Sequence, residues 1–541
     1  MVKLAAHLFD LLHRQGVNHA FGIPGDFALT LYDALAESPI EAIVMTHEPS
    51  AGFAADAYAR MRGLGLAVVT YGVGGLNMVN AVAGAYAEKS PLVVVSGGPG
   101  VRERQERDLL HHKVKSFDSQ RKIYEEVTLY AVTLDDPMMA DLHIRRAIDY
   151  ALTFKRPVYL EIPRDQVYAD IPTLPHDLPT VKPTDPDALQ EALGEMLLLL
   201  RSAQSPVILD DVDVHRFGLQ AEVVAIAERL GVPVCSTMLG KSVFPEQHPQ
   251  YIGIYNGEAG DPMVRDRVEN SDCLILLGAV LSDINLGMFT AKIRPEQTIY
   301  ISTDRIQIKH HEYHNIRFED MVAALLAVED LPKFDRSTIR PMQPRVAPDH
   351  DSVSMSGLIY ELNQFINPET LIVTDVGDAL FAADDLQTRS ESSFLCPAFY
   401  ASMGFGIPGM IGAQLADPTR RTIALVGDGA FQMTGMELLT AGRLGLNPIV
   451  IVMNNGSYTS LRSMGHEKAE FVKIAQIDYA EFARVLGGVG FVVKTAADLR
   501  QALGASQDCD RFSLIDVRLL PEDVSPALQR LGDLFAKTLK G

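Results

Sequence analysis

The fold is decided most clearly by one stretch, Thr422–Asn455, with the sequence TIALVGDGAFQMTGMELLTAGRLGLNPIVIVMNN. It begins with an apolar run, Thr422–Val426, and turns at Gly427-Asp428-Gly429. It then continues in a helical pattern and ends with a second apolar run, Pro448–Met453, followed by Asn454-Asn455. Runs that are apolar on both faces are typical of strands in a parallel sheet covered by helices. The stretch therefore predicts a strand–helix–strand unit of an α/β fold.

The same alternation extends along the rest of the chain. Helical patterns such as Ala51–Arg60 separate the apolar runs. The predicted strands end at Gly22, Thr46, Tyr71, Ser96 and Ile162 in the first third, and lie at Pro206–Leu209, Val232–Thr237, Cys273–Leu277, Thr298–Ile301, Thr370–Thr374 and Phe512–Val517 in the remainder. This order predicts doubly wound sheets throughout.

Two proline-rich polar stretches, Pro172–Pro186 and Pro332–Pro348, interrupt the alternation and are typical of linkers. A chain of 541 residues is also too long for a single hydrophobic core. The prediction is an α/β protein with three doubly wound domains and mainly parallel sheets. The expected domains are residues 1–178, 179–345 and 346–541.

Composition argues against several classes of protein. The formal net charge of −21 disfavours binding to nucleic acid or to an anionic membrane surface, because phosphates would be repelled. No apolar run approaches membrane-spanning length. The segment Met1–Leu12 has the pattern of an amphipathic helix and lacks the apolar core of a secretory signal. The scattered cysteines, Cys235, Cys273, Cys396 and Cys509, suit buried thiols in a reducing compartment. A cytoplasmic location is expected.

A glycine-rich segment offers one alternative function. Gly404-Phe405-Gly406-Ile407-Pro408-Gly409 matches the G-x-G-x-x-G fingerprint of dinucleotide-binding proteins, with Asp428 at the end of the next strand. However, Pro408 removes a backbone donor where the phosphate-binding helix should begin. Asp428 is itself enclosed by two glycines, which suits a tight turn around a ligand. An NAD-binding oxidoreductase is therefore only a remote alternative.

The residues that flank the predicted helix of Thr422–Asn455 can instead hold a cation. Magnesium prefers oxygen ligands and is often shared with phosphates. The Asp428 carboxylate, the Asn455 amide oxygen and the backbone carbonyl of Ser457 would supply three such oxygens. A helix beginning near Gly429 would point its N–H groups at the same anion. The alternative to a cation site is a surface turn followed by an unrelated asparagine pair.

This spacing resembles the diphosphate-binding motif of thiamine-diphosphate enzymes, although that family often has glycine where Ser457 stands. The resemblance implies thiamine diphosphate and Mg²⁺ as cofactors, bound through Gly427, Asp428, Gly429, Asn455 and Ser457. It also implies that Met403 lies beneath the cofactor and that the backbone of Met403 and Ala401 bonds its aminopyrimidine ring.

The resemblance gives Glu48 a catalytic role. Alone, it would be an ordinary acid at a helix N-terminus, favoured by the helix dipole. In the family, this glutamate bonds the pyrimidine nitrogen of the cofactor and thereby helps to form the thiazolium ylid, which is the nucleophile.

Asp26, in Gly22–Phe27, and the pair His111-His112 are similar to the proton-handling residues of pyruvate, indolepyruvate and phenylpyruvate decarboxylases. A histidine pair by itself is more often a solvated loop. Histidine does titrate near neutrality, and general acid–base catalysis typically contributes ~10²–10⁴ in rate. The resemblance therefore implies that Asp26, His111 and His112 are catalytic.

The likeness covers essentially the whole chain, including Gly84–Glu88 and Arg156–Pro163. It departs from pyruvate decarboxylases at Leu461, where those enzymes carry a catalytic glutamate. Phenylpyruvate decarboxylases of the bacterial indoleacetate-forming type share the leucine. The implied activity is the non-oxidative decarboxylation of a 2-oxo acid, such as phenylpyruvate or indolepyruvate, to an aldehyde and CO₂.

The expected substrate pocket follows from Leu461 and its apolar neighbours. Its predicted residues are Thr70, Phe381, Leu461 and Met464, with a C-terminal helix, Ser525–Lys537, lining or covering it. Ordinary core packing is the alternative for each, and is equally favoured for Phe381.

The resemblance also implies a homodimer or homotetramer in which Glu48 of one subunit meets the Asp428 site of its neighbour. Two other functions remain open. A thiamine-diphosphate carboligase or benzoylformate-type decarboxylase would keep Glu48, Asp428 and Asn455 but should lack the histidine pair. A non-enzymatic relative should have lost Glu48 or the cation ligands.

Overall fold

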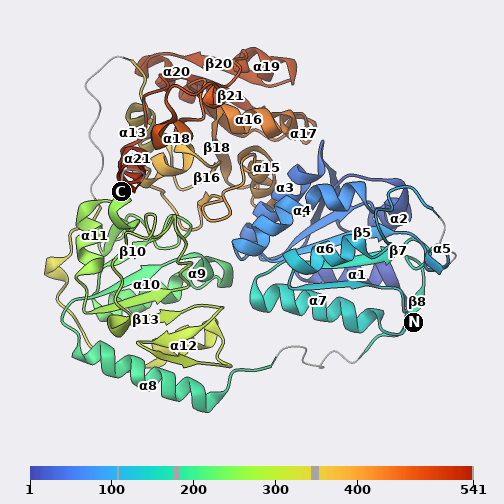
Figure 1. The fold of residues 1–541 in the computed structure, drawn as a ribbon, viewed down its shortest axis with the longest axis horizontal. Helices are drawn as coiled ribbons and strands as arrows, with labels where there is room; N and C mark the ends of the chain where they lie inside the picture. The colour runs from blue at the N-terminus through green and yellow to red at the C-terminus, as the bar shows by residue number, and fades with distance from the viewer. Residues whose placement is uncertain (106–108, 175–181, 343–351, 539–541) are drawn as a thin grey trace. The chain divides into compact units, whose positions relative to one another are not determined.

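The computed structural model describes residues 1–105, 109–174, 182–342 and 352–538 (Figure 1). The chain forms two compact units. The first comprises Met1–Lys182, Ile407–Pro418 and Thr434–Leu444, and the second comprises Pro183–Gly406, Thr419–Met433 and Gly445–Gly541. The predicted boundaries at 178/179 and 345/346 lie outside the described residues, as do parts of both predicted linkers.

The first unit contains a six-stranded sheet in which every pair of neighbouring strands is parallel. Its order is β3 (Glu41–Val44), β2 (His19–Gly22), β4 (Gly65–Val69), β5 (Leu92–Gly98), β7 (Val158–Pro163) and β6 (Tyr130–Thr133). Strand order reverses between β2 and β4, and ligands of such sheets bind at the carboxyl edge near this switch.

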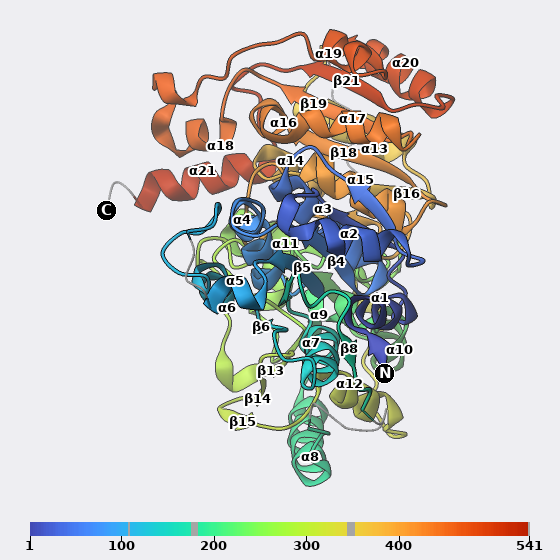
Figure 2. The same cartoon turned by 90° about the vertical axis from the view of Figure 1, so that its right-hand side faces the viewer.

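Helices cover both faces of this sheet. They are α1 (Leu4–Arg14), α2 (Leu29–Ala36), α3 (Glu48–Arg62), α4 (Val73–Ala87), α5 (Val101–Gln105), α6 (Ser119–Val127) and α7 (Ala140–Phe154). Helices α1, α2 and α7 share one apolar core with the sheet, and α1 and α7 lie side by side (Figure 2). Helix α3 packs against α4. The carboxyl ends of β3, β2 and β4 therefore open toward the starts of α3, η1 (Asp26–Ala28) and α4.

The middle of the chain forms a seven-stranded mixed sheet in the second unit. Its order is β11 (Tyr251–Ile254), β10 (Val234–Ser236), β9 (Pro206–Asp210), β12 (Cys273–Leu277), β13 (Thr298–Ile301), β14 (Ile306–Ile308) and β15 (His311–Tyr313). Strand β14 pairs antiparallel with both β13 and β15. Its helices are α8 (Pro186–Ser202), α9 (Val212–Phe217), α10 (Gln220–Leu230), α11 (Pro262–Glu269) and α12 (Phe318–Ala327).

Three buried acids, Asp210, Asp211 and Asp213, lie at the carboxyl end of the central strand β9. Asp211 accepts hydrogen bonds from the N–H groups of Val212 and Val280 at 2.7 Å each. Burial nevertheless raises the pKa of Asp211 to about 7. This edge of the middle sheet is therefore acidic and shielded from solvent.

The C-terminal part forms a third sheet, which is entirely parallel. Its order is β17 (Phe394–Leu395), β16 (Thr370–Thr374), β18 (Arg421–Gly427), β19 (Ile449–Asn454), β21 (Ser513–Arg518) and β20 (Val489–Val493). Its helices in the second unit include α13 (Met355–Phe365), α14 (Asp378–Ala382), α16 (Asp428–Thr434), α18 (Thr459–Leu461), α19 (Tyr479–Val485), α20 (Ala496–Gln507) and α21 (Pro526–Thr538). Helix α17 (Leu438–Arg443) and nearly all of α15 (Gly406–Ala416) belong to the first unit.

The predicted fold class is confirmed, and the predicted strands Cys273–Leu277, Thr298–Ile301 and Thr370–Thr374 match residue for residue. The predicted helix Met1–Leu12 is wrong at its start, because Val2 and Lys3 form a strand, β1, paired with β8 (Asp170–Ile171). Such pairing depends on a partner far away in sequence and leaves no local signal.

Two further expectations can be compared with the structure. No helix among the described residues is both long enough and apolar enough to cross a membrane. All four cysteines have free thiols, and Cys235, Cys273 and Cys396 are buried, as predicted.

A buried ion pair fastens the middle sheet to the C-terminal part within the second unit. The ammonium group of Lys241 lies 2.6 Å from Glu246 Oε1 and donates to the carbonyl of Leu386 at 2.7 Å. Glu246 Oε2 accepts the N–H of Thr388 at 2.8 Å. Both charged side chains are completely buried. Each charge is therefore compensated by the other and by these backbone groups.

Replacing either Lys241 or Glu246 by an apolar residue should leave the other as an unpaired buried charge. We expect Lys241→Met to lower the free energy of unfolding by about 3–5 kcal/mol in urea-induced unfolding. The control is Lys473→Met, which breaks an exposed pair with Glu470 and should cost less than about 1 kcal/mol. Equal losses in the two variants would contradict this account. The double variant Lys241→Met/Glu246→Leu should recover much of the loss.

Candidate active site

Three polar side chains lie at the carboxyl ends of adjacent strands of the C-terminal sheet. Asp375 follows β16, Asp428 follows β18, and Asn455 follows β19. These three strands are neighbours in parallel register. Parallel strands present their carboxyl ends at one edge, so the sheet itself brings the three residues together.

The carboxylate of Asp428 joins two of these strand ends. Its Oδ1 accepts the N–H of Gly429 at 2.9 Å, and its Oδ2 accepts the N–H of Gly456 at 2.7 Å. The residue is only 1% exposed. Burial raises the pKa of Asp428, while the backbone donors act in the opposite direction. A buried carboxylate of this kind gains stability from a bound cation.

Asn455 and Ser457 complete this end of the site. Asn455 Oδ1 accepts the N–H of Ser457 at 3.0 Å, and its amide nitrogen donates to Thr459 Oγ1 at 2.6 Å. The Ser457 carbonyl accepts that hydroxyl at 3.3 Å. Carboxylate, amide and carbonyl oxygens form a donor set suited to a hard cation such as Mg²⁺. The predicted ligands therefore lie together and fit the ion.

These groups line one end of a cavity with a volume of about 400 Å³. A Cβ added at Gly427 would meet no atom within 4 Å, so the glycine leaves this end open. All of the predicted residues of the second unit line the cavity: Phe381, Ala401, Met403, Gly427, Asp428, Gly429, Asn455, Ser457, Leu461 and Met464. The cavity thus combines an oxygen-rich end with an apolar wall.

Several apolar lining residues were not named from the sequence: Ile284, Met288, Met355, Val376, Met453 and Ile474. Ile284 and Met288 come from the loop after β12, and Leu531 comes from α21. The loop has no periodic pattern that could have indicated a site. Leu531 belongs to the helix predicted at Ser525–Lys537, which lies at Pro526–Thr538 and does line the pocket.

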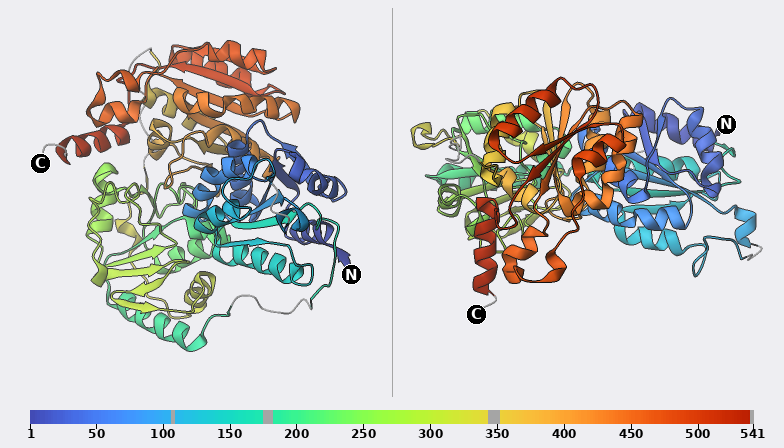
Figure 3. Two further views of the ribbon diagram at one scale, coloured as in Figure 1. Left: turned by 45° about the vertical axis from the view of Figure 1, so that its right-hand side comes forward. Right: turned by 90° about the horizontal axis from the view of Figure 1, so that it is seen from above.

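Helix α21 is fastened to the wall of the cavity. Asp378 accepts the backbone N–H of Ser525 at 3.0 Å, and Arg530 donates to the carbonyl of Ala259 at 2.6 Å. Leu528 and Leu531 pack against Phe381. In Figure 3 the dark-red helix lies alongside the orange segment Thr459–His466. The C-terminal helix therefore belongs to the cavity wall.

The glycine-rich segment has a role that its fingerprint did not suggest. The backbone N–H groups of Gly404 and Gly406 donate to the carboxylate of Asp375, at 3.1 and 2.7 Å. Asp375 is fully buried, which raises its pKa to about 6. Gly404 has a φ of +91° and Ala401 one of +55°, so the chain turns sharply there. These amides hold an internal acid and do not face a dinucleotide phosphate.

In the first unit, Glu48 is positioned by helix α4. It is the first residue of α3, and its Oε2 accepts the side-chain amide of Asn77 at 2.8 Å. A Cβ on Gly74 would lie 3.6 Å from Glu48 Oε1 and 3.0 Å from Thr70 Cγ2. The Thr70 hydroxyl is buried and has no partner among the described residues. Thr70 therefore lies near Glu48 and belongs to a different unit from the cavity described above.

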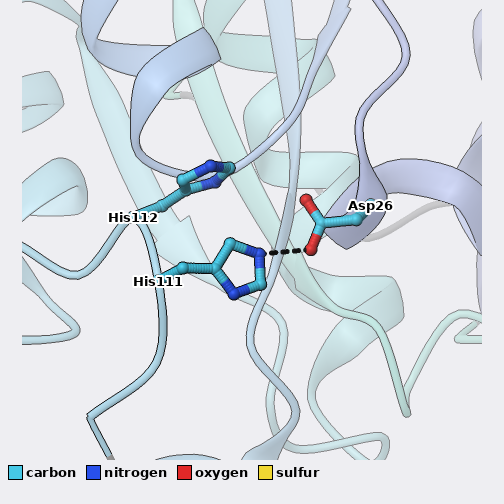
Figure 4. A group of neighbouring side chains, drawn as sticks. All are labelled: Asp26, His111 and His112. Carbon is cyan, nitrogen blue, oxygen red and sulfur yellow. Dashed lines mark hydrogen bonds and ion pairs between the residues drawn. The ribbon is translucent and has the colours of Figure 1, made fainter.

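Asp26, His111 and His112 also come together in the first unit (Figure 4). His111 Nε2 lies 2.6 Å from Asp26 Oδ2, and the centroids of the two imidazole rings are 4.6 Å apart. The Phe27 ring packs 4.9 Å from His111 and 5.9 Å from His112. Gly72 has a φ of +71°. A Cβ at this position would lie only 2.6 Å from the Cβ of His112, so only glycine fits there.

Three profiles of thiamine pyrophosphate enzymes match the chain: the N-terminal TPP binding domain at residues 2–121, the central domain at 193–327 and the C-terminal TPP binding domain at 375–517.

Relatives match over nearly their full length. The chain is 41% identical to an indole-3-pyruvate decarboxylase of Azospirillum brasilense, over 100% of this chain and 98% of that protein. It is 31% identical to an alpha-keto-acid decarboxylase of Mycolicibacterium paratuberculosis, over 96% of each. It is 29% identical to a pyruvate decarboxylase of Hanseniaspora uvarum, over 97% of this chain and 96% of that one. With all three domains matched in order, the chain belongs to the thiamine pyrophosphate enzyme family.

Proposed function

We propose that this protein converts 2-oxo acids to aldehydes and CO₂ without oxidation, using thiamine diphosphate and Mg²⁺. The observation that carries the proposal is the cavity that joins the oxygen set of Asp428, Asn455 and Ser457 to an apolar wall. The relatives named above are decarboxylases of this class.

In this proposal, Mg²⁺ is held by the Asp428 carboxylate, the Asn455 side-chain oxygen and the Ser457 carbonyl. Ala401 and Met403 hold the aminopyrimidine ring, Gly427 leaves room for the diphosphate, and Gly429 lines the same end of the cavity. Bound thiamine diphosphate supplies a nucleophilic carbon and a sink for the electron pair left when CO₂ departs.

The remaining chemistry is proton handling. Glu48 holds a proton against the pyrimidine nitrogen of the cofactor, and Asn77 orients its carboxylate. Conversion of R–CO–COO⁻ to R–CHO and CO₂ consumes one proton, which must reach the former carbonyl carbon. Asp26, His111 and His112 supply it as a clustered acid–base group, in which Asp26 and His111 share a hydrogen bond. A carboligase or benzoylformate-type enzyme would not require this trio.

The substrate is an arylpyruvate or indolepyruvate. Phe381, Leu461 and Met464, with Ile284 and Met288, offer an apolar surface beside the cation site. Burial of an aryl group is favourable by about 25 cal/mol per Å² of apolar area, which is an upper estimate for binding. Pyruvate cannot use this wall. Long aliphatic 2-oxo acids can, whereas benzoylformate places its ring too close to the reacting carbonyl.

We also propose a homodimer or homotetramer in which Glu48 of one subunit completes the Asp428 site of another. The side chains of Asp26 and His111 are 43% and 59% exposed in the single chain, which is high for groups that control a proton. A second subunit would cover them. The three predicted domains, 1–178, 179–345 and 346–541, and a cytoplasmic location with reduced cysteines, complete the proposal.

Removal of the cofactors tests the proposed reaction directly. Chelation and dialysis should abolish aldehyde formation from phenylpyruvate, and thiamine diphosphate plus Mg²⁺ should restore it. Asp428→Ala should raise the concentration of both that is needed by at least about tenfold, because a ligand is lost. The control Asp510→Ala changes an exposed acid and should need the wild-type concentrations. Activity that survives full removal, or that NAD restores, would exclude the proposal.

The substrate class is tested by steady-state rates on a panel of 2-oxo acids. The ratio kcat/KM should rank phenylpyruvate and indolepyruvate above pyruvate, and benzoylformate low. Leu461→Ala should lower kcat/KM for phenylpyruvate by about tenfold and change that for pyruvate much less, since only the aryl group contacts the wall. The control is Leu198→Ala, at an exposed leucine of α8. A clear preference of the wild type for pyruvate would contradict the arylpyruvate assignment.

Mixed dimers test the shared site. Glu48→Gln and Asp428→Ala homodimers should each be almost inactive. Co-expressed with different affinity tags and purified as heterodimers, the two variants should regain activity, because one of the two sites then receives both wild-type residues. The absence of recovery in verified heterodimers would show that each site is built within one chain.

A further inference from the structure

Asp26, His111 and His112 form a cluster that has ligand atoms of two kinds. One carboxylate oxygen and two imidazole nitrogens lie within 4.8 Å of one another. Figure 4 shows the three side chains converging from the start of η1 and from the segment after α5. Among the described residues, this is the only group of three or more such side chains that meets this distance criterion. We propose that it binds a transition-metal dication such as Zn²⁺, separately from the Mg²⁺ position.

The ligand chemistry separates the two sites. Asp428, Asn455 and Ser457 offer only oxygen, which suits Mg²⁺. Two imidazoles and one carboxylate suit Zn²⁺ and its neighbours, and leave a fourth position for water. Imidazole nitrogen is a poor ligand for Mg²⁺, so millimolar Mg²⁺ leaves the histidine site to the softer ion.

The distances permit this coordination after small rotations. Zinc bonds to nitrogen and oxygen are about 2.0–2.2 Å long, which places tetrahedral ligand atoms about 3.3–3.6 Å apart. The bond between His111 Nε2 and Asp26 Oδ2, now 2.6 Å, would open by less than about 1 Å. The other separations, 4.8 Å at most, would close by up to about 1.5 Å. Both of these side chains are half exposed, so their rotation meets little resistance.

The surroundings of the two imidazole rings differ in how far they restrict movement. Phe27 packs against both imidazoles. The guanidinium carbon of Arg164 lies 5.1 Å from the centroid of the Phe27 ring. Nδ1 of His112 is buried and has no hydrogen-bond partner among the described residues. His112 has a φ of +66°, and its backbone passes so close to Gly72 that no side chain would fit there. His112 is therefore held in position, whereas Asp26 and His111 are free to rotate toward a metal ion.

The adjacent histidines His310 and His311 provide a contrast within the same chain. His311 Nδ1 lies 2.9 Å from Glu195 Oε2, but the hydroxyl of Tyr313 donates to that same oxygen at 2.7 Å. In the described part of the chain, no third ligand of this kind joins them. Two adjacent histidines near one carboxylate are therefore not sufficient to form a metal site. The proposed site differs because the side chains of His111, His112 and Asp26 converge.

Metal binding has a consequence that rests on the proposed function. A bound dication takes the lone pairs of both imidazoles and of the Asp26 carboxylate, and these are the groups assigned to proton transfer. Zn²⁺ should therefore inhibit decarboxylation without displacing Mg²⁺ or thiamine diphosphate.

The test measures binding and activity separately on the holoenzyme, in excess Mg²⁺ and thiamine diphosphate. Zn²⁺ is titrated by calorimetry, and retained Mg²⁺ is measured by elemental analysis. Wild type should bind one tight Zn²⁺ per chain and lose activity in proportion. His111→Gln, His112→Gln and Asp26→Asn should each weaken that binding by at least about tenfold. The matched control His311→Gln should bind Zn²⁺ and be inhibited like wild type, and thermal unfolding should confirm that every variant folds.

The outcomes separate the two proposals. Unchanged Zn²⁺ affinity in all three folded variants, or release of Mg²⁺ in step with Zn²⁺ uptake, would overturn the metal site. Tight binding that the three substitutions abolish, without any inhibition of the wild type, would establish the metal site and refute the proton-transfer role of the trio.

Discussion

The architecture of the cavity depends on one buried carboxylate that is compensated by backbone N–H groups. Asp428 ties the turn after β18 to the turn after β19 through Gly429 and Gly456. A buried charge is costly unless it is hydrogen-bonded, so the two turns must keep the positions that supply these donors. The oxygens of Asn455 and Ser457 are held in place as a result.

Two other buried carboxylates near the cavity also accept hydrogen bonds from backbone N–H groups. Asp375 takes the N–H groups of Gly404 and Gly406, which positions the segment that carries Ala401 and Met403. Asp378 takes the N–H of Ser525 and fixes the start of α21. Burial raises the pKa of both acids to about 6. Three carboxylates at one sheet edge thus set the floor and walls of the cavity.

The first unit is organised differently. Its reactive groups are held by side chains: Asn77 orients Glu48, and Phe27 supports His111 and His112. Asp26 and His111 are half exposed, whereas Asp428 is almost completely buried. A rigid, buried edge suits a cation and a diphosphate. An accessible acid–base group suits proton exchange, and the same accessibility opens it to a metal ion.

Sequence alone determined the features that local patterns encode. Apolar runs identified the strands, and Gly427-Asp428-Gly429 with Asn454-Asn455 predicted a cation site, because strand, turn and helix signals act over a few residues. Tertiary structure decided what depends on distant partners. These features are the use of the Gly404 and Gly406 amides by Asp375, the entry of Met288 into the pocket, and the pairing of Asp26 with His111. Such contacts join residues tens to hundreds of positions apart, and only the packing of the folded chain specifies them.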